Sequence, residues 1–231
     1  MKTIGLLGGM SWESTIAYYQ RINLTVNQEM GGLHSAKCLL YSVDFQEIED
    51  CQSRDQWEKS AEILAGAARD LERGGADFLI LCTNTMHKVA EPIQAAVGIP
   101  LIHIVDVTLE ELRRRRISRV GLLGTRYTME QEFYRDRLAR GGVETLIPPE
   151  EEREMINSVI FDELCQGAFY PGSRAAFLKV TRNLRQEGAE AVILGCTEIG
   201  LLIRQEDTEI PLLDTTALHS EKAARLAMGL E

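Results

Sequence analysis

The sequence lacks the features that mark membrane, secreted and zinc-binding chains. No stretch approaches the ~20 apolar residues of a membrane span, and Met1-Lys2-Thr3 leads directly into an apolar run without the pattern of a signal peptide. The five cysteines are scattered, with no CxxC pair. That distribution fits a reducing cytosol better than a disulfide framework or a zinc site. We therefore expect a soluble, cytoplasmic protein that does not bind membranes.

Basic charge and cofactor motifs are also missing. The 25 basic residues stand against 35 acidic ones, a formal charge of −10, which disfavours nucleic acid as a partner. Gly5-Leu-Leu-Gly8-Gly9 lacks the GxGxxG spacing, and there is no HExxH or carboxylate cluster with metal-ligand spacing. We expect neither a nicotinamide cofactor nor a metal.

What the sequence does contain is an internal repeat. Three segments of the first half recur in the same order in the second half, at separations of 116, 113 and 111 positions: Lys2–Gly8 as Ser118–Gly124, Gly75–Leu81 as Gly188–Leu194, and Ile99–Ile102 as Ile210–Leu213. The chain is therefore interpreted as a duplicated unit.

Short apolar runs alternate with amphipathic segments in each repeat. The GLLG runs, Cys38–Val43, Phe78–Leu81 and Val192–Leu194 are typical of strands covered on both faces, and Gln56–Arg73 and Arg174–Glu187 are typical of helices. This alternation predicts an α/β fold of two pseudo-symmetric, doubly wound parallel-sheet domains, with the active site in the cleft between them. The expected domains are residues 1–100 with 212–231, and 101–211.

The strand ends are where ligands bind in such sheets. Aligned without gaps, the repeat sets Thr83 against Cys196, Asn84 against Thr197, and Thr85 against Glu198. Small polar side chains and backbone N–H groups at a strand–helix junction suit an α-carboxylate. A helix N-terminus also lowers the pKa of a cysteine, so Cys196 is expected to form a reactive thiolate.

Other candidates at these ends have structural interpretations as well. Cys82 lies one residue before Thr83 and is expected to pack in the core, because adjacent strand residues face opposite sides. His87 is equally consistent with a ligand-orienting group and with a partly exposed surface residue. Cys38, Cys51 and Cys165 are interpreted as small hydrophobic side chains.

At these residues the sequence resembles the aspartate/glutamate racemase family of cofactor-independent amino-acid racemases. The resemblance covers essentially the whole chain and includes Gly8-Gly9-Met10-Ser11-Trp12-Glu13-Ser14, Asn84-Thr85-Met86-His87 and Gly195-Cys196-Thr197-Glu198. It implies two pseudo-symmetric domains, a homodimer, no cofactor, and one cysteine per half acting on opposite faces of the substrate Cα. It further implies that Cys196 is catalytic and that the substrate is bound by Met10, Gln52, Asn84, Thr85, Thr125, Thr197 and Glu198.

The sequence departs from the family pattern at two positions. Thr83 stands where the first cysteine is usual, so Thr83 is expected to be the counterpart of Cys196. Cys165 stands near a position that is often basic. We expect an amino-acid racemase for aspartate, glutamate or a broader range. The alternatives are a single-cysteine decarboxylase like the arylmalonate decarboxylases, an isomerase like the maleate isomerases, and a non-catalytic amino-acid-binding protein.

Overall fold

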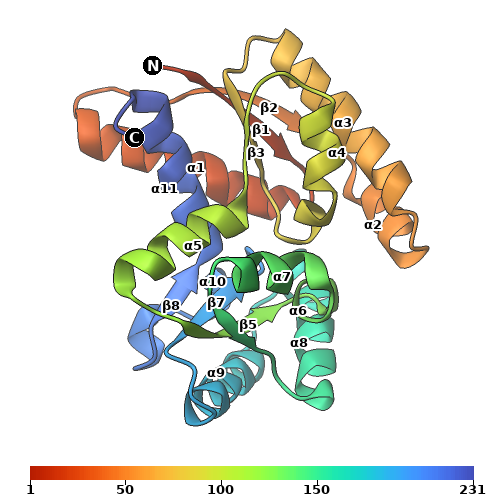
Figure 1. Ribbon diagram of the computed structural model, residues 1–231, viewed down its shortest axis with the longest axis vertical. Coiled ribbons are helices and arrows are strands. Elements are labelled where there is room, and N and C mark those ends of the chain that lie inside the picture. Colours follow the sequence, from red (N-terminus) through yellow and green to blue (C-terminus); the bar gives the residue numbers. More distant parts are fainter. The chain divides into compact units, whose positions relative to one another are not determined.

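The computed structural model describes residues 1–231. Its contacts divide the chain into two compact units. Unit 1 contains Met1–Ile104 and His219–Glu231, and unit 2 contains Val105–Leu218. Each unit has one four-stranded parallel sheet, with strand order β2-β1-β3-β4 in unit 1 and β6-β5-β7-β8 in unit 2 (Figure 1). The expected α/β fold with two related parallel sheets is confirmed.

The elements follow one another in the same alternating pattern in both halves. The first half contains β1 (Thr3–Gly8), α1 (Trp12–Met30), β2 (Lys37–Ser42), α2 (Phe45–Ser53), α3 (Trp57–Arg73), β3 (Phe78–Leu81), α4 (Ala90–Ala95), β4 (Leu101–Ile102) and α5 (Ile104–Arg115). The second half contains β5 (Arg119–Gly124), α6 (Arg126–Glu130), α7 (Glu132–Arg140), β6 (Glu144–Leu146), α8 (Glu150–Asp162), α9 (Pro171–Gln186), β7 (Ala191–Gly195), α10 (Ile199–Leu202), β8 (Leu212–Asp214) and α11 (Thr215–Met228).

Both sheets use the same register. In unit 1, Leu7 of β1 pairs with Leu81 of β3. In unit 2, Leu123 of β5 pairs with Leu194 of β7. The sequence offsets of 116 and 113 positions therefore map one ladder onto the other, residue by residue.

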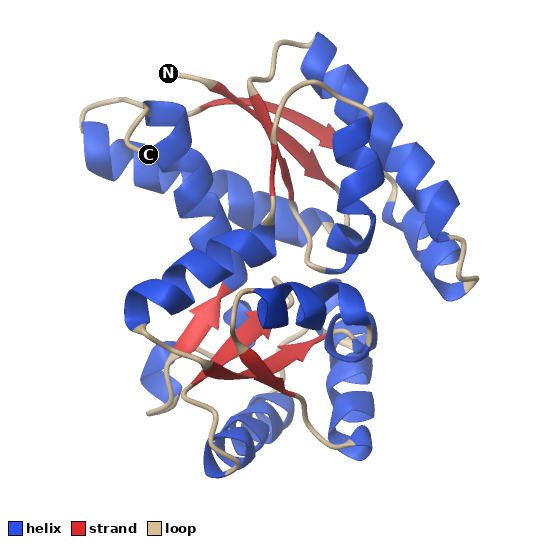
Figure 2. Ribbon diagram, viewed as in Figure 1, coloured by secondary structure: helices blue, strands red, loops and turns tan.

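The two central strands of unit 1, β1 and β3, bury both of their faces, as expected for a parallel sheet between two helical layers. Leu7, Leu79 and Leu81 pack in one core cluster with side chains of α3 and α4. Alternate strand residues pack on the other face with α1 and α11: Ile4, Leu6, Phe78, Ile80 and Cys82. Figure 2 shows the helices on both sides of each sheet.

The last helix of each repeat packs in the unit built mainly by the other repeat. α11 ends the second repeat, but from His219 onward it belongs to unit 1; α5 ends the first repeat, but from Val105 onward it belongs to unit 2. A buried tyrosine contacts each exchanged helix. Tyr18 Oη lies 2.9 Å from His219 Nδ1, and Tyr134 forms a hydrogen bond with Thr108. The two tyrosines are 116 positions apart, and their partners are 111 apart.

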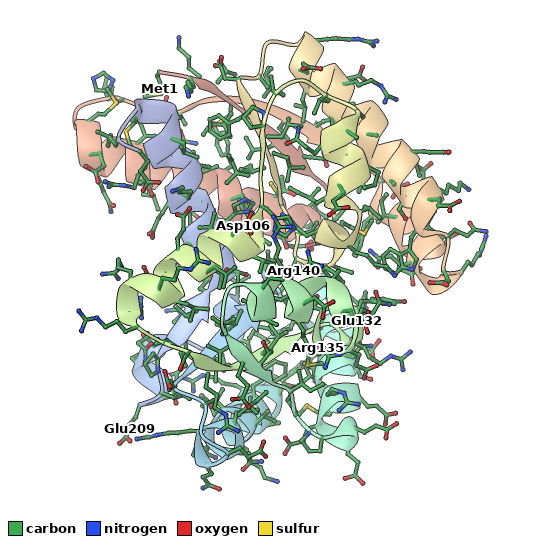
Figure 3. All side chains as sticks on the ribbon, viewed as in Figure 1. Met1, Asp106, Glu132, Arg135, Arg140 and Glu209 are labelled. Carbon is green, nitrogen blue, oxygen red and sulfur yellow. The ribbon has the colours of Figure 1, made fainter.

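An ion pair joins α5 to α7 within unit 2. Arg137 donates from Nε to Oδ1 of Asp106 and from Nη2 to Oδ2, each at 2.6 Å. Asp106 is labelled on α5 in Figure 3. A bidentate pair of this kind fixes the orientation of the two side chains.

The units differ from the expected domains at their edges. The expected boundaries separated β4 from the first domain and β8 from the second. In the structure, β4 pairs with β3 through Leu79–Leu101 and Ile80–Ile102, and β8 pairs with β7. These boundaries were wrong because strands of two or three residues give too little sequence pattern to show which sheet they join. None of the helices combines the length and the apolar composition that a membrane span requires.

Candidate active site

The segment after β7 forms the polar end of the sheet in unit 2. Cys196, Thr197 and Glu198 follow the strand directly and are all buried. Gly195 ends the strand at a crowded position, where a Cβ atom would lie 3.0 Å from the carbonyl oxygen of Leu123. Because glycine has no Cβ, the chain can pass close to β5 at this position, and Cys196 follows directly.

Glu198 gathers the polar side chains of this segment. The Cys196 thiol donates to Oε2 of Glu198 at 3.1 Å, and the Thr197 hydroxyl donates to the same oxygen. The half-buried thiol of Cys165 lies 3.8 Å from Oε1. One buried carboxylate thus contacts two thiols and a hydroxyl, and it accepts the hydrogen bond of the Cys196 thiol.

The pKa of Cys196 is raised well above its ordinary value, first by burial and then by the negative charge of Glu198. The expected lowering of this pKa was wrong. α10 has only 4 residues, so its terminal field is weak, whereas the carboxylate is in direct contact. At neutral pH the cysteine of the free protein is a thiol, and a thiolate forms only if a base takes its proton.

The segment after β3 is the counterpart in unit 1. Cys82 still belongs to the ladder, because its N–H donates to the Leu7 carbonyl at 2.9 Å. Its counterpart at an offset of 113 positions is Gly195, which pairs with Gly124. The structural register therefore places Thr83, and not Cys82, at the position equivalent to Cys196.

Cys82 itself lies in the core. Its side chain is fully buried in the cluster that contains Tyr18, Ile22 and Ala223, and burial raises its pKa. The expectation that Cys82 packs against the neighbours of the strand is confirmed. Thr83 begins the turn that leaves the sheet, with its N–H donating to the Leu81 carbonyl at 2.8 Å.

His87 is buried, so the interpretation as a surface residue is wrong. It lies in the 3₁₀ turn Thr85–Val89. Its Nδ1 is 2.8 Å from the Thr83 carbonyl oxygen, and its Nε2 accepts a hydrogen bond of 3.2 Å from the N–H of Ile104. The histidine therefore contacts the backbone of the turn that holds Thr83.

The remaining predicted substrate residues are all buried, and all except Gln52, which lies in α2, follow a strand of their own unit closely in the chain. Unit 1 holds Met10, Gln52, Asn84 and Thr85, and unit 2 holds Thr125, Thr197 and Glu198. Gln52 donates from Nε2 to the Met86 sulfur at 2.9 Å, and the Thr125 side chain caps α6 by accepting from the N–H of Thr128.

Sequence reasoning missed the aromatic cluster next to His87. His103 and His219 lie edge-on to the His87 ring, with centroid separations of 4.5 and 5.8 Å. No local pattern identifies this cluster, because His219 comes from an exchanged helix far along the chain. The structure shows no group of three or more His, Cys, Asp or Glu side chains that could hold a metal ion.

The Asp/Glu/Hydantoin racemase family matches residues 7–223 of this sequence. The chain belongs to this family. It is 27% identical over 218 residues to the broad specificity amino-acid racemase RacX of Bacillus subtilis, covering 93% of each chain. Among solved structures, it is similar to a proposed Asp/Glu racemase from Yersinia pestis, with 50% identity, a TM-score of 0.92, and coverage of 99% of this chain and 100% of the other.

A second solved structure shows the same likeness. An aspartate racemase homologue from Pyrococcus horikoshii is 35% identical with a TM-score of 0.85, and the match covers 99% of this chain and 100% of that one. These relatives indicate an isomerase-type enzyme, and family membership supports amino-acid racemase activity.

Proposed function

We propose that this protein racemises α-amino acids without pyridoxal phosphate, metal or nicotinamide. The observation that supports the proposal best is the Cys196 thiol at the end of β7, hydrogen-bonded to the buried carboxylate of Glu198. Thr83 stands at the equivalent position of the other repeat. Inversion at carbon needs a base and an acid on opposite faces of Cα, so we assign these roles to Cys196 and Thr83.

The chemistry begins with the thiol proton. Glu198 takes the proton from Cys196 Sγ, and the resulting thiolate removes the α-proton of the substrate while the C–H electron pair remains on Cα. Hydrogen-bond donors such as Asn84, Thr85 and Thr125 stabilise the negative charge that spreads into the substrate carboxylate. The Thr83 hydroxyl then donates a proton to the opposite face of Cα and completes inversion. The Thr83 oxygen recovers a proton from water, and Glu198 returns its proton to water.

A hydroxyl is a much weaker base than a thiolate, and this makes the proposed site unequal. The enantiomer whose α-hydrogen faces Cys196 should exchange that hydrogen with solvent faster than its mirror image does. Since the overall equilibrium between enantiomers is 1:1 by symmetry, the inequality appears in the exchange of each enantiomer and not in the final mixture.

The proposal is tested by incubating the protein in D₂O with single enantiomers of a panel of amino acids that starts with aspartate, glutamate and homologues with neutral side chains. Deuterium uptake at Cα with inversion supports racemisation. Release of CO₂ from arylmalonates indicates the decarboxylase alternative, cis–trans conversion of maleate indicates the isomerase, and binding without exchange indicates a binding protein. Because no cofactor is expected, the protein should keep full activity after dialysis against a chelator and should show no absorbance band of bound pyridoxal phosphate.

We further propose that the protein acts in the cytoplasm as a homodimer. All five cysteines are free thiols, which is consistent with a reducing compartment. Trp12, Ile16 and Tyr19 leave one stripe of α1 exposed, and the edge strand β2 exposes Leu40 on the face of the sheet that α1 covers. A second copy of this chain is the proposed partner for this face, and Tyr19→Glu should then lower the mass measured by light scattering to that of a monomer.

A further inference from the structure

We propose that His87 is a positioning residue for Thr83. The His87 ring holds the peptide unit that follows Thr83 in place as a clamp, and this keeps the Thr83 hydroxyl at the reacting face. The inference rests on the proposed function, because it assumes that Thr83 acts in the reaction. It adds a residue to which the resemblance assigns no role.

The ring makes two hydrogen bonds that together define its tautomer. Nε2 faces the N–H of Ile104 at 3.2 Å and must accept, since a backbone N–H can only donate. A neutral imidazole that accepts at Nε2 carries its hydrogen on Nδ1, and Nδ1 lies 2.8 Å from the Thr83 carbonyl oxygen. His87 is therefore a neutral donor to Thr83 and an acceptor from Ile104.

The surroundings hold the ring in this orientation. His87 is only 3% exposed, and the rings of His103 and His219 pack edge-on against it. His219 is itself fixed, with Nδ1 at 2.9 Å from Tyr18 Oη and Nε2 at 2.8 Å from the Ile102 carbonyl oxygen. A ring that is packed and bonded at both nitrogens has little freedom to turn.

The clamp acts on the backbone that determines where the hydroxyl points. Because the peptide unit is planar, holding the Thr83 carbonyl also fixes the plane that joins Thr83 to Asn84. The backbone N–H of His87 donates to the Asn84 carbonyl at 3.1 Å and closes the same turn. A misplacement of about 1 Å at a reacting group can cost ~10²-fold in rate, so an orienting group of this kind has a measurable effect.

The clamp belongs to unit 1 alone. At the offset of 113 positions the counterpart of His87 is Gly200, and a Cβ atom there would lie 2.8 Å from Oδ2 of Asp214. In unit 2 the strand end is tied differently, by the Thr215 hydroxyl that donates to the Leu194 carbonyl at 2.8 Å. The histidine accompanies the weak hydroxyl of Thr83 and has no equivalent beside the thiol.

The test compares two rates for one enantiomer in D₂O, run separately for each enantiomer. For the enantiomer whose α-hydrogen faces Cys196, deuterium uptake with retained configuration reports proton exchange at the Cys196 face, and formation of the mirror image reports delivery from the Thr83 side. For the other enantiomer the two assignments are reversed. A purely structural role lowers both rates together. A role in placing Thr83 lowers inversion more than retention, and thus raises the retention-to-inversion ratio of the enantiomer that faces Cys196.

His87→Ala is expected to raise this ratio by up to about tenfold, the loss of inversion expected when the Thr83 hydroxyl itself is removed, which lies within the ~10²-fold that misplacement of a reacting group can cost. His87→Gln, which keeps a donor and an acceptor, should give an intermediate ratio and decides the question if the alanine variant does not fold. Cys82→Ala is the matched control, since it perturbs the same strand end without touching the Thr83 carbonyl, and its ratio should equal that of the wild type. Wild-type ratios in the folded His87 variants overturn the inference alone, whereas a wild type that neither exchanges nor inverts any amino acid overturns the proposed function with it.

Discussion

The ends of β3 and β7 occupy equivalent positions in the two repeats but carry different reactive groups. Both strands follow a Gly-Ala pair, pair with a GLLG strand in the same register and turn into a short helix. After β7 the chain presents a thiol in contact with a buried carboxylate. After β3 it presents a hydroxyl on a backbone held by a histidine. The two repeats thus share a framework and differ at the two positions that are proposed to react.

Under the proposed function, this difference shows how one half of the reaction can change while the fold around it stays the same. The thiol is paired with a proton acceptor, and the hydroxyl is paired with an orienting group. A reactive group with a neighbouring base can start a proton transfer, whereas a poor base contributes mainly by being placed well. The predictions below test this division, and they run from the largest expected free-energy effect to the smallest.

Removing the thiol should have the largest effect. Cys196→Ala is expected to lower kcat by ~10²–10⁴-fold, the usual contribution of a positioned acid or base, with an unchanged circular dichroism spectrum. Cys38→Ala, which removes a half-buried cysteine of β2, is the control and should stay near wild type. A Cys196→Ala enzyme that keeps a tenth of the wild-type kcat contradicts the assignment.

The histidine cluster of unit 1 should make folding sensitive to acid. Burial lowers the pKa of His219 from 6.5 to about 4, so the unfolded chain binds a proton more readily than the folded one between these values. The free energy of unfolding should therefore rise with pH from about 4 to 6.5, by up to about 3 kcal/mol.

Urea titrations at several pH values between 4.5 and 7.5 measure this slope. In unit 2 the position equivalent to His219 holds Thr108, which has no titratable group. The pH dependence that His219 causes is therefore a property of unit 1. His219→Gln serves as the control and should flatten the slope in this window. An equal slope in the variant means that other groups cause the acid sensitivity.

Cys82 tests which residue of β3 corresponds to Cys196. Because the thiol is fully buried in the core, Cys82→Ser should lower the free energy of unfolding by roughly 1–3 kcal/mol, the cost of an uncompensated hydroxyl in an apolar site. Turnover of the folded variant should remain largely intact. A variant as inactive as Cys196→Ala would instead make Cys82 the second catalytic thiol.

Thr83 should show the smallest loss when it is truncated. Thr83→Ala is expected to lower inversion by roughly tenfold, near the lower end of general acid–base effects, since a hydroxyl transfers protons poorly. Thr83→Cys should raise the exchange of the slower enantiomer, because it places a thiol on both faces. Both rates are measured by NMR in D₂O, and equal behaviour of Thr83→Cys and wild type contradicts the comparison between the two strand ends.

Most strands, helices and equivalent positions of the repeats could be predicted because they depend on local sequence patterns. Apolar runs such as Phe78–Leu81 identify buried strands, and the offsets between repeats identify equivalent positions, since both depend only on neighbouring residues and their order. The strand Phe78–Leu81 and the helix expected at Gln56–Arg73 appear within one residue of their expected bounds. The equivalence of Thr83 and Cys196 followed from the sequence alone and agrees with the register of both sheets.

Tertiary structure decided the electrostatics and the long-range contacts. Whether Cys196 is a thiol or a thiolate depends on its burial and on the exact position of the Glu198 carboxylate, neither of which a strand–helix pattern specifies. Tyr18 and His219 lie 201 positions apart and meet only because the last helices are exchanged between units. Sequence periodicity describes which face of an element is buried, but the partner on that face comes from the folded chain, and with it the proton affinity of every group that the partner touches.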